Sequence, residues 1–174
     1  MITCIIKNIK TLDQNTYNNF IDQLPIHQLT CSSCHHSGCL TKHAYYNRAI
    51  KTPTGKVILR ILRVKCSHCN TTHAILLISM VPYSQVLYKD HIRIITQYIQ
   101  GNDFEDIMMD TIDIDESSIQ YIIKQYLRHW KERVLSYSIT LNEMMYRDCF
   151  KYFNRAFMQI KCTPNKLYSC THIT

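Results

Sequence analysis

Two Cys-x-x-Cys pairs are the clearest chemistry-bearing feature of this chain of 174 residues. The first pair is Cys31 and Cys34, the second is Cys66 and Cys69, and 31 residues separate them. Zn²⁺ prefers tetrahedral thiolate coordination, and each such turn presents two sulfurs to one ion. A thioredoxin-like redox pair would need a βαβ context, which the sequence lacks. The spacing therefore predicts one structural zinc ion held by four thiolates, with no position left open for water.

Other cysteines and histidines lie near these pairs or near the C-terminus. Six of them could replace one zinc ligand, although surface or second-shell hydrogen-bonding roles are more typical when four cysteines are present: His35, His36, Cys39, His43, His68 and His73. A looser set, whose spacing matches no ligand pattern and whose role stays open, is Cys149, Cys162, Cys170 and His172. Cys149 sits in a helical pattern and is expected to be a buried thiol.

The residues around the cysteine pairs predict the strands of a zinc ribbon. Segments 43–50, 56–65 and 72–81 are rich in β-branched and aromatic residues, and a Thr-Pro-Thr-Gly turn lies between the first two. The hairpin between the pairs brings the four cysteines together. A short strand at residues 4–6 and a small helix at 16–24 precede it. The expected fold class is α+β, with a small β zinc ribbon followed by a helical, helix-turn-helix-like region.

From Lys89 onward the apolar period becomes helical. Ile92, Ile95 and Ile99 form one face, and Gly101 is a natural C-cap. Further helices are expected after an N-cap at Asn102 or Asp103, from Asp115 to about 137, and over about 142–160. The helix from Asp115 is expected to bury one apolar face: Ile119, Ile122, Ile123, Tyr126, Leu127, Trp130 and Val134. The predicted domains are an N-terminal strand and helix extension (1–30), the zinc ribbon (31–82), helix-turn-helix-like helices (89–137) and a C-terminal helix and tail (138–174).

Residues 103–128 fit a helix, a tight turn and a second helix. Met108, with Ile107 as its alternative, and Ile112 are expected to face inward on the first of these helices, and Ile114 to fill the turn. Side chains suited to base edges and phosphates point outward from the second helix: Ser117, Ser118, Gln120, Tyr121, Lys124, Gln125 and Arg128. Two departures from the usual pattern are Asp113 in place of a turn glycine and Met109 in place of a small residue. Acidic side chains of the same segment would repel phosphate unless they face away from it or bind basic residues: Glu105, Asp106, Asp110, Asp113 and Glu116.

Charge is distributed in blocks along the chain. The formal net charge is +7, with eight basic residues and no acid from Gln23 to Lys89, then eight acids against one arginine from Asp90 to Glu116. From Ser117 to the end of the sequence, nine bases face three acids. Four thiolates with one Zn²⁺ contribute −2, so the net charge falls to about +5. We expect phosphates to be held by basic residues of the ribbon strands and loops: Lys51, Lys56, Arg60, Arg63 and Lys65.

These motifs, in this order, resemble the N-terminal zinc ribbon and helix-turn-helix of bacterial insertion-sequence transposases. The resemblance covers about residues 28–130 and rests on CSSC, RILRVKCSHCNTTHAILL, VPYSQV and IDESSIQYII. It implies that the four cysteines and the helix at 116–128 take part in binding transposon ends. The chain also resembles, over nearly its whole length, short bacterial proteins known only as a domain of unknown function. Too few acids follow residue 116 to build a transposase nuclease core with three separated carboxylates, so catalysis is not implied.

The sequence favours a non-catalytic zinc-ribbon DNA-binding protein, derived from or associated with a transposon. No Gly-rich phosphate loop, Ser/His/Asp order or open metal site is recognisable, so we expect no enzymatic activity and no small-molecule substrate. The alternatives are a protein-interaction module that docks on a transposase or the transcription machinery, and an RNA-binding ribbon using Tyr45 and Tyr46. A homodimer or a transposase partner stays open. No secretory signal or membrane span is recognisable, so a cytoplasmic location is expected.

Overall fold

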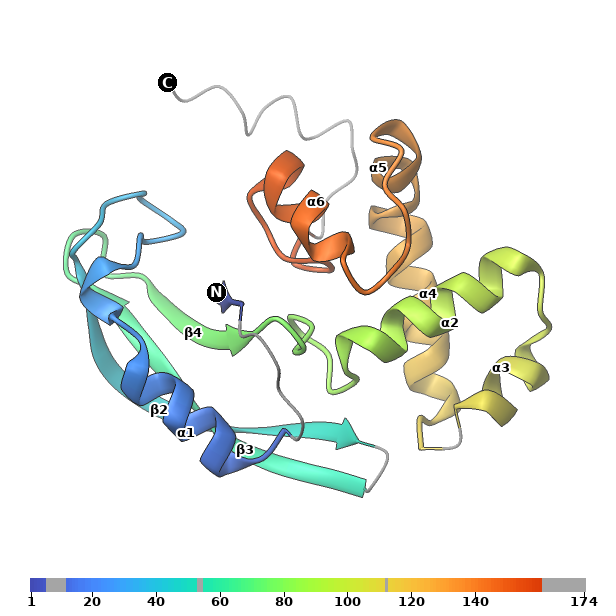
Figure 1. The fold of residues 1–174 in the computed structure, drawn as a ribbon, viewed down its shortest axis with the longest axis horizontal. Helices are drawn as coiled ribbons and strands as arrows, with labels where there is room; N and C mark the ends of the chain where they lie inside the picture. Colours follow the sequence, from blue (N-terminus) through green and yellow to red (C-terminus); the bar gives the residue numbers. More distant parts are fainter. Residues whose placement is uncertain (6–11, 53–54, 112, 161–174) are drawn as a thin grey trace. The chain divides into compact units, whose positions relative to one another are not determined.

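The computed structural model describes residues 1–5, 12–52, 55–111 and 113–160. It divides into two compact units, Met1–Ile78 and Ser79–Thr174, which are treated separately below (Figure 1). The described residues form one sheet of four strands, which lies in the first unit, and six α-helices. The expected α+β class is therefore confirmed.

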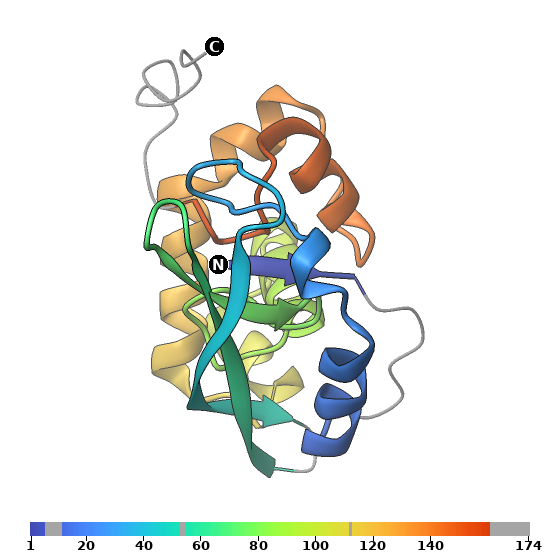
Figure 2. The ribbon, with the colours of Figure 1, turned by 90° about the vertical axis from the view of Figure 1, so that its left-hand side faces the viewer.

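The sheet of the first unit has the strand order β1-β4-β3-β2. Strand β1 (Ile2–Cys4) pairs parallel with β4 (Thr72–Leu77), whereas β4 pairs antiparallel with β3 (Gly55–Cys66). Strand β2 (Leu40–Thr52) forms a long antiparallel hairpin with β3 (Figure 2). All three of the strands expected near the cysteine pairs are present, and the short N-terminal strand occupies the edge of the sheet beside β4.

The hairpin register brings the two cysteine pairs to one end of the sheet. Leu40, at the start of β2, pairs with Cys66 at the end of β3, while Thr52 pairs with Gly55 at the other end. The pairing shifts between Lys42 and Ala44, where a β-bulge interrupts the ladder. Because Leu40 follows the first cysteine pair and Cys66 begins the second, this pairing holds both turns side by side.

Two side chains of helix α1 (Gln14–Gln23) bind backbone groups of β3. They do so at β3 residues that lie beyond its pairing with β4. The Tyr17 hydroxyl, fully buried, accepts from the Leu62 N–H and donates to the Ile75 carbonyl, each at 3.0 Å. The Gln14 side chain bonds both the N–H and the carbonyl of Arg60. Buried backbone groups need such partners, so these two side chains hold α1 on the sheet. A 3₁₀ helix (Ile26–Gln28) follows α1.

The second unit begins with helices α2 (Tyr88–Gln100) and α3 (Phe104–Asp110). Gly101 ends α2 with φ 85°, a left-handed conformation that glycine adopts without strain. The Asp103 side chain accepts from the Asp106 N–H and caps α3. Both predicted caps are confirmed.

The long helix expected from Asp115 to about residue 137 is interrupted. Helix α4 (Glu116–His129) ends at Trp130, whose φ of −121° is not helical, and α5 (Lys131–Ser136) follows. Trp130 is fully buried and packs edge to face on Phe153 and Phe157, so burial of its ring takes precedence over helix continuity. The last helix, α6 (Met145–Phe153), is shorter than the 142–160 span expected.

The core of the second unit contains most of the apolar residues that periodicity placed inside. Ile92, Ile95, Ile119 and Ile122 are all buried. Three expected core side chains are instead more than a third exposed: Ile99, Met108 and Leu127. Of the two alternatives on α3, Ile107 rather than Met108 is buried, and Ile112 lies outside the described residues. No helix of the described residues is long and apolar enough to cross a lipid bilayer.

Candidate metal centre and nucleic-acid interface

The four cysteines predicted as ligands meet in one cluster of the first unit. All four sulfur atoms lie within 4.8 Å of one another, with Cys31 and Cys66 buried and Cys34 and Cys69 half-buried. Contacts across the two turns join Cys31 to Cys69 at 3.7 Å and Cys34 to Cys66 at 3.6 Å. The cluster could hold a metal ion.

The two turns that carry these cysteines use the same backbone hydrogen bonds although their sequences differ. In the first, the Cys31 carbonyl accepts from His35 and the Cys31 N–H donates to His36. In the second, the Cys66 carbonyl accepts from Asn70 and the Cys66 N–H donates to Thr71. Each turn closes with a residue of positive φ, 61° at His35 and 59° at Asn70.

Those turns direct backbone amides at the first sulfur of each pair. The Ser33 N–H lies 3.4 Å from Cys31 Sγ, and the Cys69 N–H lies 3.4 Å from Cys66 Sγ. The hydrogen bond from the Cys69 amide lowers the pKa of the Cys66 thiol to about 6, although burial acts in the opposite direction. At Cys34 the backbone of His36 lowers the pKa, but desolvation and the neighbouring thiols outweigh it, raising the pKa to about 12. Deprotonation is therefore uneven within the cluster, because the Cys66 thiol is more acidic than the Cys34 thiol.

Two buried neighbours lie against the cluster, and both belong to the six possible substitute ligands. His73 is 2% exposed, and its Nε2 lies 3.2 Å from Cys31 Sγ. Cys39 Sγ lies 3.3 Å from Cys66 Sγ and donates to the His36 carbonyl. Neither belongs to the group of four mutually close ligand atoms, so each is placed to hydrogen-bond a ligand sulfur.

The looser C-terminal cysteine set is described only at Cys149. This residue is fully buried in α6, and burial raises the pKa of its thiol to about 12, as an unreactive core cysteine requires. The other three members, Cys162, Cys170 and His172, lie outside the described residues.

The seven predicted nucleic-acid contacts of α4 divide by exposure and by local hydrogen bonds. Tyr121, Lys124 and Arg128 are exposed, whereas Ser118 and Gln125 are half-buried. Several of these side chains form hydrogen bonds within the helix. The Asp115 carboxylate accepts from the hydroxyls of Ser117 and Ser118 and from the Ser118 N–H. The Gln120 side chain donates to Glu116. The basic side chains Lys124 and Arg128 are the charged, exposed members of the set.

The five predicted phosphate contacts of the first unit occupy both faces of the hairpin. Neighbouring strand residues alternate between faces, so Lys56 and Arg60 lie on one face and Arg63 and Lys65 on the other. Lys51 pairs directly with Lys56, and burial, with the Lys56 charge, lowers its pKa. Each face also carries an arginine over an aromatic ring: Arg60 lies 4.5 Å from the Tyr45 ring centre, and Arg63 lies 5.4 Å from that of Tyr46.

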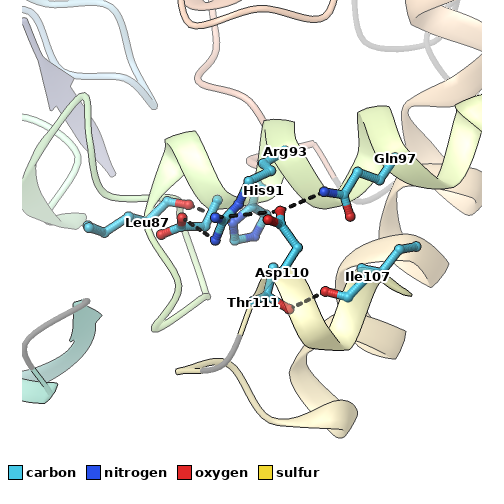
Figure 3. A network of polar contacts seen from close by, with 8 residues as sticks. Leu87, His91, Arg93, Gln97, Ile107, Asp110 and Thr111 are labelled. Carbon is cyan, nitrogen blue, oxygen red and sulfur yellow. Dashed lines mark hydrogen bonds and ion pairs between the residues drawn. The ribbon is translucent and has the colours of Figure 1, made fainter. Parts of the chain in front are cut away.

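Part of the acidic block is neutralised inside the second unit. Asp110 of α3 accepts from Gln97 at 2.6 Å and forms an ion pair with Arg93 at 3.6 Å, and both partners belong to α2 (Figure 3). Arg93 also pairs with Asp90 at 3.2 Å. Two acids of the block are thus bound to an arginine of their own unit, which reduces the repulsion expected towards phosphate.

The fold and the site define an α+β protein whose four-cysteine cluster is able to hold a metal ion. The chain belongs to the family described as Domain of unknown function (DUF6431), whose model matches residues 31–122. The match begins at Cys31 and therefore contains both cysteine pairs. It agrees with the expected resemblance to a short uncharacterised family, while the transposase resemblance stays a prediction. No curated protein and no solved structure matches the chain.

Proposed function

We propose that the chain is a non-catalytic DNA-binding protein in which the cysteine cluster holds one structural Zn²⁺ as the core of a zinc ribbon. The observation that carries the metal assignment is the spacing of the sulfurs. Thiolates at ~2.3 Å from a tetrahedral zinc lie ~3.8 Å apart, and the pairs across the two turns are 3.7 and 3.6 Å apart. Four sulfurs fill the coordination sphere, so the ion supports the fold and leaves no place for substrate.

The helices of the second unit supply the proposed sequence-reading element. α3 ends at Asp110 and α4 begins at Glu116, and α2 packs on both helices (Figure 1). Ile107, Ile114 and Ile119 are all buried where the helices meet. This arrangement fits a helix-turn-helix, in which the second helix enters the major groove of DNA. Lys124 and Arg128 lie one turn apart on the exposed side of α4, as contacts to phosphate or guanine need.

The basic hairpin supplies the proposed contacts that do not depend on base sequence. No acid lies between Gln23 and Lys89, and the exposed cations Lys56, Arg60 and Arg63 project from β3. Because they occupy both faces of the hairpin, they suit contacts to phosphates on either side rather than to one flat surface. An origin in a transposon rests on the motifs shared with insertion-sequence transposases.

The test is duplex binding by the zinc-loaded full chain, measured by fluorescence anisotropy over a range of salt concentrations. We expect affinity to fall steeply with salt, and the Lys124→Glu/Arg128→Glu variant to bind more weakly with a slope shallower by about 2. The control variant Lys131→Glu/Lys151→Glu has the same change in net charge, on exposed residues of α5 and α6. This control should bind duplex DNA nearly as tightly as wild type. Absence of duplex binding at low salt would refute the proposal.

A second candidate function, protein interaction, is favoured by an apolar groove in the second unit. The groove has a volume of about 630 Å³, and its lining includes Tyr98, Phe104 and Leu127, with Lys124 and Arg128 among its residues. An apolar segment bearing carboxylates would complement it. Leu127→Ser should weaken such a partner's binding and leave the salt dependence of duplex binding unchanged, whereas the charge-reversal variant should weaken both.

A further inference from the structure

A second group of metal-ligating side chains lies beside the four-cysteine cluster. Cys34 Sγ and one ring nitrogen from each of His36 and His68 all lie within 4.8 Å of one another. The two histidines are exposed, and they come from different cysteine turns: His36 follows the first pair, and His68 lies inside the second. Their imidazole rings stack with centres 3.6 Å apart at an interplanar angle of 20°.

The hydrogen bonds of His36 suit a metal ligand. Its Nδ1 lies 3.1 Å from the Cys34 carbonyl, so the N–H on that nitrogen can donate to the backbone. Metal-binding histidines usually make such a bond through one ring nitrogen, which fixes the tautomer and leaves the lone pair of the other nitrogen for the ion. The same contact holds the ring beside the Cys34 sulfur.

Distances and charge favour a second cation here. Around a tetrahedral zinc, nitrogen ligands lie ~3.3 Å from each other and ~3.6 Å from a thiolate sulfur, estimated from the usual bond lengths. Rotation of two exposed side chains would reduce the observed spread of up to 4.8 Å to these values. One zinc with four thiolates carries a formal charge of −2, which a second divalent ion would neutralise.

We propose that Cys34, His36 and His68 bind a second divalent ion of the zinc type, with the Cys34 thiolate bridging both ions. This inference rests on the proposed zinc at the four-cysteine cluster, because the bridging thiolate is one of its ligands. Three protein ligands leave a fourth position for water, and both imidazoles face solvent. The second ion is therefore bound more weakly than the first and exchanges with ions in solution.

The test counts zinc equivalents in the reduced, tag-free full chain by titration with Zn²⁺ against a chromophoric zinc chelator. Wild type should take up two equivalents, the second more weakly, and His36→Ala/His68→Ala should take up one, with affinity for the second reduced by at least about tenfold. His27→Ala, which removes an exposed histidine elsewhere in the first unit, should retain two. Uptake of the first equivalent shows that the variant still folds.

The outcomes separate this inference from the proposed function. One equivalent in wild type overturns the second site and leaves the structural zinc intact, whereas none overturns both. Two equivalents in the double variant overturn the assignment to His36 and His68. As an independent readout, Co²⁺ added to protein already holding one zinc should produce the strong visible absorption of tetrahedral cobalt with a thiolate ligand. The double variant should lack this absorption, and its appearance there would contradict the inference.

Discussion

At the scale of single residues, His91 is a titratable side chain enclosed in the second unit. It is 1% exposed, its Nδ1–H donates to the Leu87 carbonyl, and burial lowers its pKa from 6.5 to about 4 (Figure 3). The unfolded chain therefore binds a proton that the folded chain does not between these pH values. The stabilising contribution of neutral His91 is complete above pH 6.5 and declines by about 3 kcal/mol as the pH falls towards 4.

The measurement is urea unfolding of wild type and His91→Gln between pH 7 and pH 4.5. Glutamine keeps a side-chain N–H donor but cannot take up the proton, so the variant should lose less stability on acidification. Asp90 acts in the opposite direction, because burial raises the pKa of its carboxyl against the lowering effect of Arg93. Both proteins contain Asp90, so its contribution cancels in the comparison. Equal pH dependence in the two proteins would contradict this account of His91.

His73 should determine how strongly the cysteine cluster binds its proposed zinc. Its Nε2 is placed to donate to Cys31 Sγ at 3.2 Å, and Ser32 Oγ lies 3.2 Å from its Nδ1. In His73→Leu the thiolate loses this donor, and we expect affinity for the first zinc equivalent to fall roughly 10- to 100-fold. His73→Gln, which keeps an N–H, should lose less. Competition with a zinc chelator measures the effect, and unchanged affinity in the leucine variant would rule out this role.

The chemistry of the site was predictable to different degrees. Spacing alone identified the four clustered cysteines, because two Cys-x-x-Cys turns are a local pattern. The same reasoning could not separate His73 and Cys39, which contact the ligand sulfurs, from His43, which is exposed on β2. That difference depends on strand pairing between distant segments, and no local spacing encodes it.

At the scale of elements, α4 depends on its first residues. The Asp115 carboxylate accepts from the Ser118 N–H at 2.8 Å and from the hydroxyls of Ser117 and Ser118. Asp115→Ala removes this cap and should lower the free energy of unfolding by about 1 kcal/mol. Asp115→Ser keeps an N-cap oxygen and should lose only part of that. Urea denaturation followed by circular dichroism provides the measurement, and an alanine variant as stable as wild type would contradict it.

The presence of the helices and their caps could be predicted from the sequence. The length of each helix, and which of its sides is buried, could be predicted less well. Asp103, Gly101 and Asp115 mark ends that the structure confirms, because capping depends on neighbouring residues. The break at Trp130 was missed, since its apolar spacing continues that of α4 into α5. Leu127 was predicted inside and is 39% exposed, because the described partners of α4 do not cover that side.

At the scale of the whole molecule, the net charge is the sum of three blocks along the sequence, which are basic, acidic and again basic. The basic hairpin of the first unit contrasts with the acidic start of the second, where Asp110 and Asp90 are paired with Arg93. This internal pairing favours the proposal of DNA binding although many acids lie near the proposed reading helix, because paired acids repel phosphate less. The charge blocks themselves could be read from sequence, whereas the pairing required α2 and α3 to be packed together.

The most direct test of the account is selection of DNA from a random duplex pool by the zinc-loaded, tag-free full chain, followed by sequencing. If α4 reads the major groove, a short motif should be enriched by wild type and by Lys131→Glu/Lys151→Glu. Lys124→Glu/Arg128→Glu should lose that enrichment. Selected sequences that match the input pool for the wild-type chain would contradict the central claim that this protein recognises DNA.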